Sequence, residues 1–321
     1  MVIEKIIKYA ALIKSSVHIC NKAFKSSESE KTVNLLPYKD ADFYLIKYVK
    51  LQAVKDILVC PHCYRAELDF VPPGIVCKKC KSTFRQNTLM YDFLNSEMRE
   101  NASVKHTEKV SSHDYIQIQN ELTTKHPYGL ILDHGCGLKT HYLPNVVYFD
   151  IVDYETTDVR GIAERLPFRD NSFESVISIA VLEHVKNPFE CAKEIVRVLK
   201  PGGTLYVDVP FLQTYHGYPD HYYNMTMNGL RNLFKDDIEI SQCFPSHTPL
   251  KLFPWYIKTY LSGLSIEDQK EFLQMRIEDF LDEDRFMGKH FVPNLSPQAH
   301  EIIAYAHTLI GSKKEITRER P

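Results

Sequence analysis

The second half of the chain contains four runs of apolar residues that polar residues hardly interrupt. They read GLILD from residue 129, NVVYFDIV from 145, FESVISIAV from 173 and GTLYVDVPF from 203. Runs of this length, rich in β-branched and aromatic residues, are typical of strands that are covered on both faces of a parallel sheet. The pattern therefore predicts an α/β domain in this half of the chain.

The segment NPFECAKEIVRVLKPGG, between the third and fourth runs, predicts an amphipathic helix. Asn187 can cap this helix, Pro188 fits its first turn, and residues 201–203 end it. Its apolar face consists of Phe189, Ala192, Ile195, Val196 and Leu199. A further helix, NGLRNLF, is expected after Thr226 as its cap, and residues 238–244, IEISQCF, are expected to form a sixth strand.

Changes in composition and in the pattern of apolar residues divide the chain into four parts. Residues 1–55 predict an N-terminal helical segment, and residues 56–95 hold paired cysteines among short β-like runs. Residues 96–126 are polar and lack regular apolar periodicity at their centre, so they predict a linker. Residues 127–321 then form the α/β domain, with a helical insertion at about 249–298.

Composition and charge are those of an ordinary folded protein. Hydrophobic residues make up 44% and charged residues 25% of the 321 residues, and the formal net charge is -2. Such a chain has no broad basic field for nucleic acid or an anionic membrane. No apolar run approaches the length of a bilayer span, and charges interrupt residues 1–17, which predict an amphipathic helix and not a signal peptide. We expect a cytoplasmic protein without membrane insertion.

Four of the eight cysteines form two CxxC pairs, Cys60 with Cys63 and Cys77 with Cys80. Each turn can aim two thiolates at one point, and two such turns supply the soft ligands of a tetrahedral structural Zn2+. A reducing compartment argues against disulfides, and the double spacing argues against idle thiols. Four thiolates leave no open position for catalysis, and His62 between the ligands is expected to be a bystander.

The segment around these cysteines, from ILVCPHCYRAEL to GIVCKKCKSTFRQNTLMYDFL, resembles the small Trm112-like zinc ribbons. Such ribbons occur alone or at the front of methyltransferases. The resemblance rests mostly on the cysteines and the hydrophobic frame around them. It implies a structural or docking role, in which the ribbon supports a homodimer or binds a protein partner.

A glycine-rich turn follows the first apolar run. Gly135 and Gly137 permit positive φ and a close backbone approach to a ligand, and Asp133 precedes them. Asp150 ends the second run, where a carboxylate can bind both hydroxyls of a ribose that lies across the turn. A dinucleotide would also need a third glycine, but Lys139 occupies that place. The residues therefore favour a nucleoside-sized cofactor without phosphate.

From this turn onward the sequence resembles class I S-adenosylmethionine-dependent methyltransferases of the type 11 group. DHGCG matches their first motif, AERLPFRDNSFESVIS their third and fourth, and LEHVKNPFECAKEIVRVLKPGGTLYVDVP their remaining core, over about residues 128–211. The resemblance implies a Rossmann-like class I methyltransferase sheet with helices on both faces, preceded by the ribbon and the helical segment. It implies S-adenosyl-L-methionine as the cofactor.

The same resemblance assigns cofactor contacts residue by residue. Asp133, Gly135 and Gly137 lie at the methionine part, Asp150 binds the ribose, Ala163 and Glu164 lie beside the adenine, and Ala180 lines the floor. Ile162 stands where the family often has an aspartate for the adenine amino group, so backbone groups and Glu164 are expected to recognise adenine. The family's last antiparallel strand would fall at residues 301–314, although their periodicity also allows a helix.

The acceptor of the methyl group would lie beyond the carboxyl ends of the strands. Methyl transfer to oxygen benefits from a base. The candidates are His184 after the fourth strand and His216, Asp220 and His221 after the fifth. Each histidine could equally be a structural group, His184 above all. A metal triad of His216, Asp220 and His221 is a minor alternative, because adjacent residues point in different directions in regular structure.

We expect an S-adenosylmethionine-dependent methyltransferase (EC 2.1.1.-) that methylates a hydroxyl of a small molecule, sugar or glycan. An RNA base methyltransferase is an alternative, because ribosomal-RNA guanine methyltransferases also place a zinc ribbon before this domain. The near-neutral charge and the missing asparagine-proline-proline-aromatic loop argue against a nucleic acid substrate. A further alternative is a non-catalytic binding or scaffold module with a degenerate methyltransferase fold, which Lys139 and Ile162 support and Asp150 opposes.

Overall fold

The computed structural model describes residues 41–71, 74–87, 89–102, 114–246, 252–282 and 286–303. The chain divides into two compact units. The first unit runs to Phe211 and resumes over Gly217–Phe244, and the second consists of Leu212–His216 and the residues from Pro245 onward. The cysteine segment and the α/β sheet therefore belong to one unit, and the helices expected at about 249–298 belong to the other.

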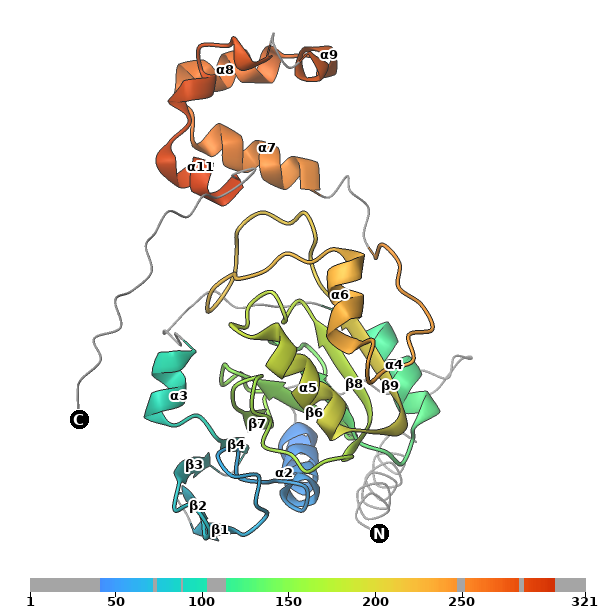
Figure 1. Ribbon diagram of the computed structural model, residues 1–321. Helices are drawn as coiled ribbons and strands as arrows, with labels where there is room; N and C mark the ends of the chain where they lie inside the picture. Colours follow the sequence, from blue (N-terminus) through green and yellow to red (C-terminus); the bar gives the residue numbers. More distant parts are fainter. Residues whose placement is uncertain are drawn as a thin grey trace, which may run out of the picture. The chain divides into compact units, whose positions relative to one another are not determined.

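A mixed sheet forms the body of the first unit (Figure 1). In the described part of the chain its strands are ordered β1-β2-β3-β4-β7-β6-β5-β8-β9. Their bounds are Leu68–Val71 (β1), Gly74–Cys77 (β2), Thr83–Asn87 (β3), Met90–Asp92 (β4), Ile131–His134 (β5), Val146–Asp150 (β6), Val159–Arg160 (β7), Phe173–Ile179 (β8) and Leu199–Asp208 (β9). Strands β1 to β4 pair antiparallel, and the remaining pairs, including β4 with β7, are parallel. The winding order reverses between β5 and β8, where ligands bind in open α/β sheets.

Strands β5 and β6 are buried on both faces and β8 nearly so, as their apolar sequences predict, whereas most of β9 is only half-buried. The described helices of the first unit are Ala41–Lys55 (α2), Ser96–Asn101 (α3), Ile116–Lys125 (α4), Pro188–Val198 (α5) and Met227–Phe234 (α6). Val147 and Phe149 of β6 belong to a buried cluster that includes Ile195 of α5. Val146 and Tyr148 belong to a second cluster, to which α2 and α4 contribute side chains. The predicted α/β arrangement is confirmed.

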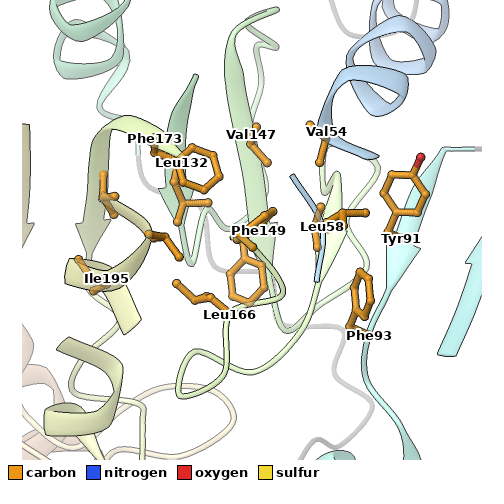
Figure 2. Close-up of a cluster of buried hydrophobic side chains, with 14 of the residues drawn as sticks. Val54, Leu58, Tyr91, Phe93, Leu132, Val147, Phe149, Leu166, Phe173 and Ile195 are labelled. Carbon is orange, nitrogen blue, oxygen red and sulfur yellow. The ribbon is translucent and has the colours of Figure 1, made fainter. Parts of the chain in front are cut away.

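The cysteine segment shares its core with the parallel sheet. Leu58 and Phe93 belong to the same buried cluster as Phe149, and Figure 2 shows these side chains together. Cys60 and Cys77, both fully buried, are members of this cluster as well. Burying one large apolar side chain contributes about 1.5–3 kcal/mol. The ribbon is therefore stabilised by the sheet, and the sheet by the ribbon.

Two predicted helices begin at the expected caps. The Asn187 side chain accepts a hydrogen bond from the Glu190 N–H (3.2 Å) at the start of α5, and Thr226 caps α6 through the Gly229 N–H (3.0 Å). Helix α5 ends at Val198, before the proline and glycines that were expected to stop it. Those residues lie in β9, where a shift of register against β8 accommodates them.

Three expectations differ from the structure. Residues 238–244 form no strand, because no described strand lies beside them to pair with their backbone. The stretch expected to be a linker contains α3, which Asn95 caps through the Met98 N–H (2.8 Å), and α4, which docks on the sheet. Residues 301–303 end the helix Pro297–Ile303 (α11), so they form the helix that was the alternative and not the strand. The rest of 301–314, and the helix expected at 1–17, lie outside the described residues.

The second unit is helical in its described part. It contains Leu252–Ser262 (α7), Ile266–Gln274 (α8), Ile277–Leu281 (α9), the 3-10 turn Val292–Asn294 (η2) and α11. Ser265 caps α8 by accepting a hydrogen bond from the Asp268 N–H (3.1 Å). Tyr260, Phe272 and Phe291 form the centre of its own buried cluster. These three aromatic residues thus form a core within the second unit, whereas others, such as Phe253 and Tyr256 of α7, are exposed.

Helix α2 is bound to the sheet through a buried lysine. The Lys50 ammonium donates to the Val146 carbonyl (2.6 Å), lies 2.7 Å from the Asp158 carboxylate and covers the ring of Tyr142 at 3.5 Å. Breaking a buried ion pair leaves an uncompensated charge and costs about 3–5 kcal/mol. We expect Lys50→Met to lower the free energy of unfolding by about this amount in urea denaturation.

The matched control for this substitution is Lys193→Met in α5. The Lys193 side chain is 68% exposed and pairs with Glu190 across one helical turn. Such surface pairs contribute about 0–1 kcal/mol. Equal effects of the two substitutions would show that the buried lysine does not hold α2 to the sheet.

Candidate functional site

Two matching turns carry the four cysteines predicted to bind zinc. In each turn the residue after the second cysteine has a positive φ, 53° at Tyr64 and 65° at Lys81. The N–H of that residue donates to the carbonyl of the first cysteine, Cys60 (2.7 Å) or Cys77 (3.0 Å). The repeated conformation brings all four sulfur atoms within 4.8 Å of one another.

The sulfur atoms have the spacing of a tetrahedral metal site. The Sγ atoms of Cys60 and Cys80 are 3.5 Å apart, and those of Cys63 and Cys77 are 3.6 Å apart. Zn–S bonds of about 2.3 Å in tetrahedral geometry place thiolates about 3.8 Å apart, so the four residues fit Zn2+. His62 is outside this group, and its Nε2 lies 3.0 Å from the Asn95 amide nitrogen.

The ribbon attaches to the sheet on both sides of the loop 161–166, which carries the two residues expected beside the adenine. Before the loop, β4 pairs in parallel with β7. After the loop, the Val59 N–H donates to the Pro167 carbonyl (3.0 Å), and the Arg169 N–H donates to the Ile57 carbonyl (2.8 Å). The ribbon therefore holds both ends of this loop.

The loop is also fixed from within the α/β part of the unit. The Leu166 N–H donates to the Glu194 carboxylate of α5 (2.7 Å). Ala163 packs against the buried cluster, whereas Glu164 is half-buried. Ala163 and Glu164 therefore lie on a loop whose backbone is anchored by α5 and by the ribbon.

The glycine turn and Asp150 meet directly. Gly135 and Gly137 have φ of 68° and 63°, and a Cβ on Gly135 would collide with Val181. The Gly137 N–H donates to one oxygen of the Asp150 carboxylate (2.7 Å), and the Val152 N–H donates to the other (2.8 Å). The acid at the end of β6 and the turn after β5 thus form one site, as the sequence predicts for a ribose and its neighbouring groups.

Asp133 is fully buried and holds α4 against the glycine turn. Its carboxylate accepts hydrogen bonds from the Tyr115 hydroxyl (2.6 Å) and the Gln119 side-chain amide (2.7 Å). The ammonium of Lys139, also buried, lies 3.5 Å from the centre of the Tyr115 ring. Burial raises the pKa of Asp133, and the charge of Lys139 opposes this shift. Sequence reasoning missed Tyr115 and Gln119, because they lie in the polar stretch that carries no motif.

The turn after β8 brings His184 to the segment that resumes at Gly217. Ala180, which begins the turn, has a φ of 54°, a conformation that costs free energy for a residue with a side chain and is concentrated at functional sites. The His184 Nδ1–H donates to the Asp220 carbonyl (2.6 Å). Because a carbonyl only accepts, the neutral ring carries its hydrogen on Nδ1 and leaves a lone pair on Nε2. The contact with Asp220 thus fixes the orientation of the His184 ring.

The other predicted candidates are distributed between the two units. The His221 ring lies 5.8 Å from that of His184, and its Nε2 is 3.0 Å from the Asn224 side-chain oxygen. His216 belongs to the second unit, where its Nδ1–H donates to the Thr214 carbonyl (2.8 Å) and its ring packs against Trp255. Within the first unit, therefore, His184, Asp220 and His221 come together at the carboxyl end of β8.

Known proteins resemble the central part of this chain. The family of methyltransferase domains called Methyltransf_11 matches residues 132–207. An uncharacterised protein of Methanocaldococcus jannaschii is 37% identical over 91 residues, which are 25% of this chain and 40% of that protein. Cycloartenol-C-24-methyltransferase 1 of rice is 36% identical over 81 residues, 25% of this chain and 21% of the enzyme. The chain thus spans less than half of the length of these relatives.

A human relative and two solved structures complete the comparison. The human probable tRNA methyltransferase 9B is 32% identical over 108 residues, 29% of this chain and 24% of that protein. A possible histamine N-methyltransferase of Thermotoga maritima aligns with 19% identity over 38% of this chain and 76% of its own, with a TM-score of 0.29. A putative methyltransferase of Anabaena variabilis aligns with 15% identity over 55% and 89%, with a TM-score of 0.32.

The sheet is Rossmann-like, and it contains the segment that matches the family of methyltransferase domains. The matched segment begins in β5, ends in β9 and contains β6, β7 and β8. These five strands are neighbours in the sheet, in the order β7-β6-β5-β8-β9. The four clustered cysteines before it are compatible with a zinc ribbon. Among the described helices, none combines the length and the apolar character needed to cross a bilayer.

Proposed function

We propose that this protein is an S-adenosylmethionine-dependent methyltransferase. The observation that carries the proposal is the match of residues 132–207 to a methyltransferase domain, in which Asp150 and Gly137 are joined by a 2.7 Å hydrogen bond at the ends of neighbouring strands. An acid that also fixes the glycine turn is well placed to bind a ribose across that turn. When bound, the cofactor supplies an electrophilic methyl group on a sulfonium.

The residues of the chain divide the binding of this cofactor among them. Asp150 would accept hydrogen bonds from the ribose, and Gly135 and Gly137 would lie at the methionine part. Ala163 and Glu164 of loop 161–166 would lie beside the adenine, and Ala180 would line the floor of the site. The four-cysteine site, which fits Zn2+ in its spacing, has a structural role in this proposal, because it lies in the core that also supports the adenine loop.

The proposed acceptor is a hydroxyl of a small molecule, sugar or glycan. A hydroxyl is a weak nucleophile until its proton is removed, so its methylation benefits from a base next to the methyl group. The candidate bases gather at the carboxyl end of β8, where the Nδ1–H of His184 is bound to the Asp220 carbonyl. The formal net charge of -2 supports a small acceptor over a polyanion.

The first test is calorimetric titration of the purified, zinc-loaded protein with S-adenosylmethionine. Binding at micromolar concentrations would support the proposal and justify a screen of hydroxylated acceptors. Absence of binding would contradict it and favour a scaffold module.

An RNA acceptor is the second candidate, because a human relative is named a probable tRNA methyltransferase. RNA binding depends steeply on salt, since each neutralised phosphate releases counterions. Transfer of labelled methyl groups to RNA, with an affinity that falls strongly as salt is raised, would favour RNA over the small-molecule acceptor.

The proposed function predicts that cofactor affinity depends on pH. Burial raises the pKa of Asp150 to about 6, although the N–H groups of Val152 and Gly137 favour the carboxylate. Ribose hydroxyls donate to the ionised carboxyl, so the affinity is full above this pKa and is lost as pH falls through it. We expect a decrease of roughly tenfold per pH unit below about pH 6 in calorimetric titrations.

Asp150→Asn is the control for this pH dependence. The amide has nearly the same shape but does not titrate, so its weaker binding should not change over the same pH range. A wild-type affinity that is constant down to about pH 5 would show that Asp150 does not titrate in the site.

A further inference from the structure

Glu183 is a buried carboxyl group whose two oxygens have no hydrogen-bond partner among the described residues. Its exposed fraction is 0%. Neither Oε1 nor Oε2 accepts a hydrogen bond from another described residue. Buried polar groups are nearly always paired, because desolvating an unpaired one costs free energy. An unpaired carboxyl at this depth indicates that a ligand completes its hydrogen bonds.

This carboxyl lies at the reactive end of the sheet. The backbone carbonyl of Glu183 accepts hydrogen bonds from the N–H groups of Tyr222 (2.7 Å) and Tyr223 (3.2 Å), in the segment predicted to bind the acceptor. Two residues earlier in the chain, Val181 packs so closely against Gly135 that a side chain at position 135 would collide with it. Glu183 therefore stands between the glycine turn and the segment after β9.

The surroundings of Glu183 suit a group that exchanges a proton. Its Oε1 lies 3.7 Å from His184 Nε2, the nitrogen that carries the lone pair. Burial raises the pKa of Glu183 to about 8, and the negative charge of Asp208 adds to this shift. A positive charge placed beside the carboxyl would lower that pKa and favour the carboxylate. The methyl sulfonium of the proposed cofactor is such a charge.

We propose that Glu183 is a catalytic residue that contacts the acceptor hydroxyl and receives its proton. The inference rests on the proposed function. In the transfer, a bond forms between the acceptor oxygen and the methyl carbon, and the carbon–sulfur bond breaks with its electron pair remaining on sulfur. The acceptor proton passes to the Glu183 carboxylate. One positive sulfonium and one negative carboxylate thus become a neutral thioether and a neutral carboxylic acid.

The test uses two cofactor analogues and needs no acceptor. Sinefungin carries an ammonium group where the cofactor carries its methyl sulfonium, whereas S-adenosylhomocysteine is neutral there. Both dissociation constants are measured by calorimetry at about pH 9, where the carboxyl is ionised. A carboxylate next to this position should favour sinefungin. We expect Glu183→Gln to reduce the preference for sinefungin over S-adenosylhomocysteine by roughly tenfold or more.

Glu174→Gln is the matched control, because Glu174 lies at the opposite end of β8 and pairs with Lys200 (2.6 Å). This variant should leave the preference unchanged. Thermal unfolding at about pH 9 supplies a second measurement: Glu183→Gln should keep or raise the midpoint, since it removes a buried carboxylate that is ionised at this pH. A lower midpoint with an unchanged preference would identify a structural role and overturn the inference. Failure of the wild-type protein to bind either analogue would overturn the proposed function, and this inference with it.

Discussion

Asp150→Ala is expected to weaken the binding of S-adenosylmethionine by roughly a hundredfold or more. A hydrogen bond to a charged group contributes about 1.5–3 kcal/mol, and the two ribose hydroxyls would both donate to this carboxylate. The substitution also removes the acceptor of the Gly137 and Val152 N–H groups, so the glycine turn loses its anchor to β6. Calorimetric titration of both proteins measures the loss.

The structural part of this effect can be separated from the loss of ribose contacts. Asp150→Asn keeps one oxygen that can accept a hydrogen bond from the Gly137 N–H. Its thermal midpoint should therefore be closer to that of the wild type than its affinity for the cofactor is. 5′-Methylthioadenosine retains the ribose, so it should lose affinity in Asp150→Ala as the full cofactor does. Full affinity of the alanine variant for both ligands would exclude Asp150 from the cofactor site.

Cys60→Ala is expected to remove the bound zinc and to destabilise the whole first unit. Cys60 is fully buried in the core that the ribbon shares with the parallel sheet. Loss of the metal should therefore weaken the packing of the sheet as well as that of the ribbon. Zinc binding contributes directly to folding free energy, and a loss of about 4 kcal/mol would lower the thermal midpoint by roughly 10 °C. Metal content and thermal unfolding measure these effects.

The same variant should bind S-adenosylmethionine more weakly, because the ribbon holds both ends of loop 161–166. Hydrogen exchange should increase in this loop and at residues 57–59, which pair with the segment after it. Cys243→Ser is the control, because Cys243 lies outside the cluster of four. It should change neither zinc content nor affinity. Loss of zinc with full cofactor affinity would show that the ribbon does not support the adenine loop.

Much of the fold and part of the candidate site could be predicted from the sequence, because they depend on local patterns. The strands are recognisable as apolar runs. Helices α5 and α6 begin at residues whose side chains cap the first turn. The cysteines of each pair are separated by two residues. The glycine turn and Asp150 end consecutive strands, which parallel pairing must bring to one edge. Residues 238–244 show the limit of such patterns, since an alternating segment becomes a strand only beside a partner.

What the sequence determined by itself was therefore an α/β sheet with a glycine turn, an acid at the next strand end and four cysteines in two turns. Only the tertiary structure joined the ribbon to the sheet through β4 and β7, placed Tyr115 and Gln119 on Asp133, and buried Glu183 without a hydrogen bond from another described residue. These features depend on contacts between residues that are far apart in the chain. Periodicity and spacing indicate which secondary structure a segment prefers. They do not specify which distant segment packs against it or pairs with it.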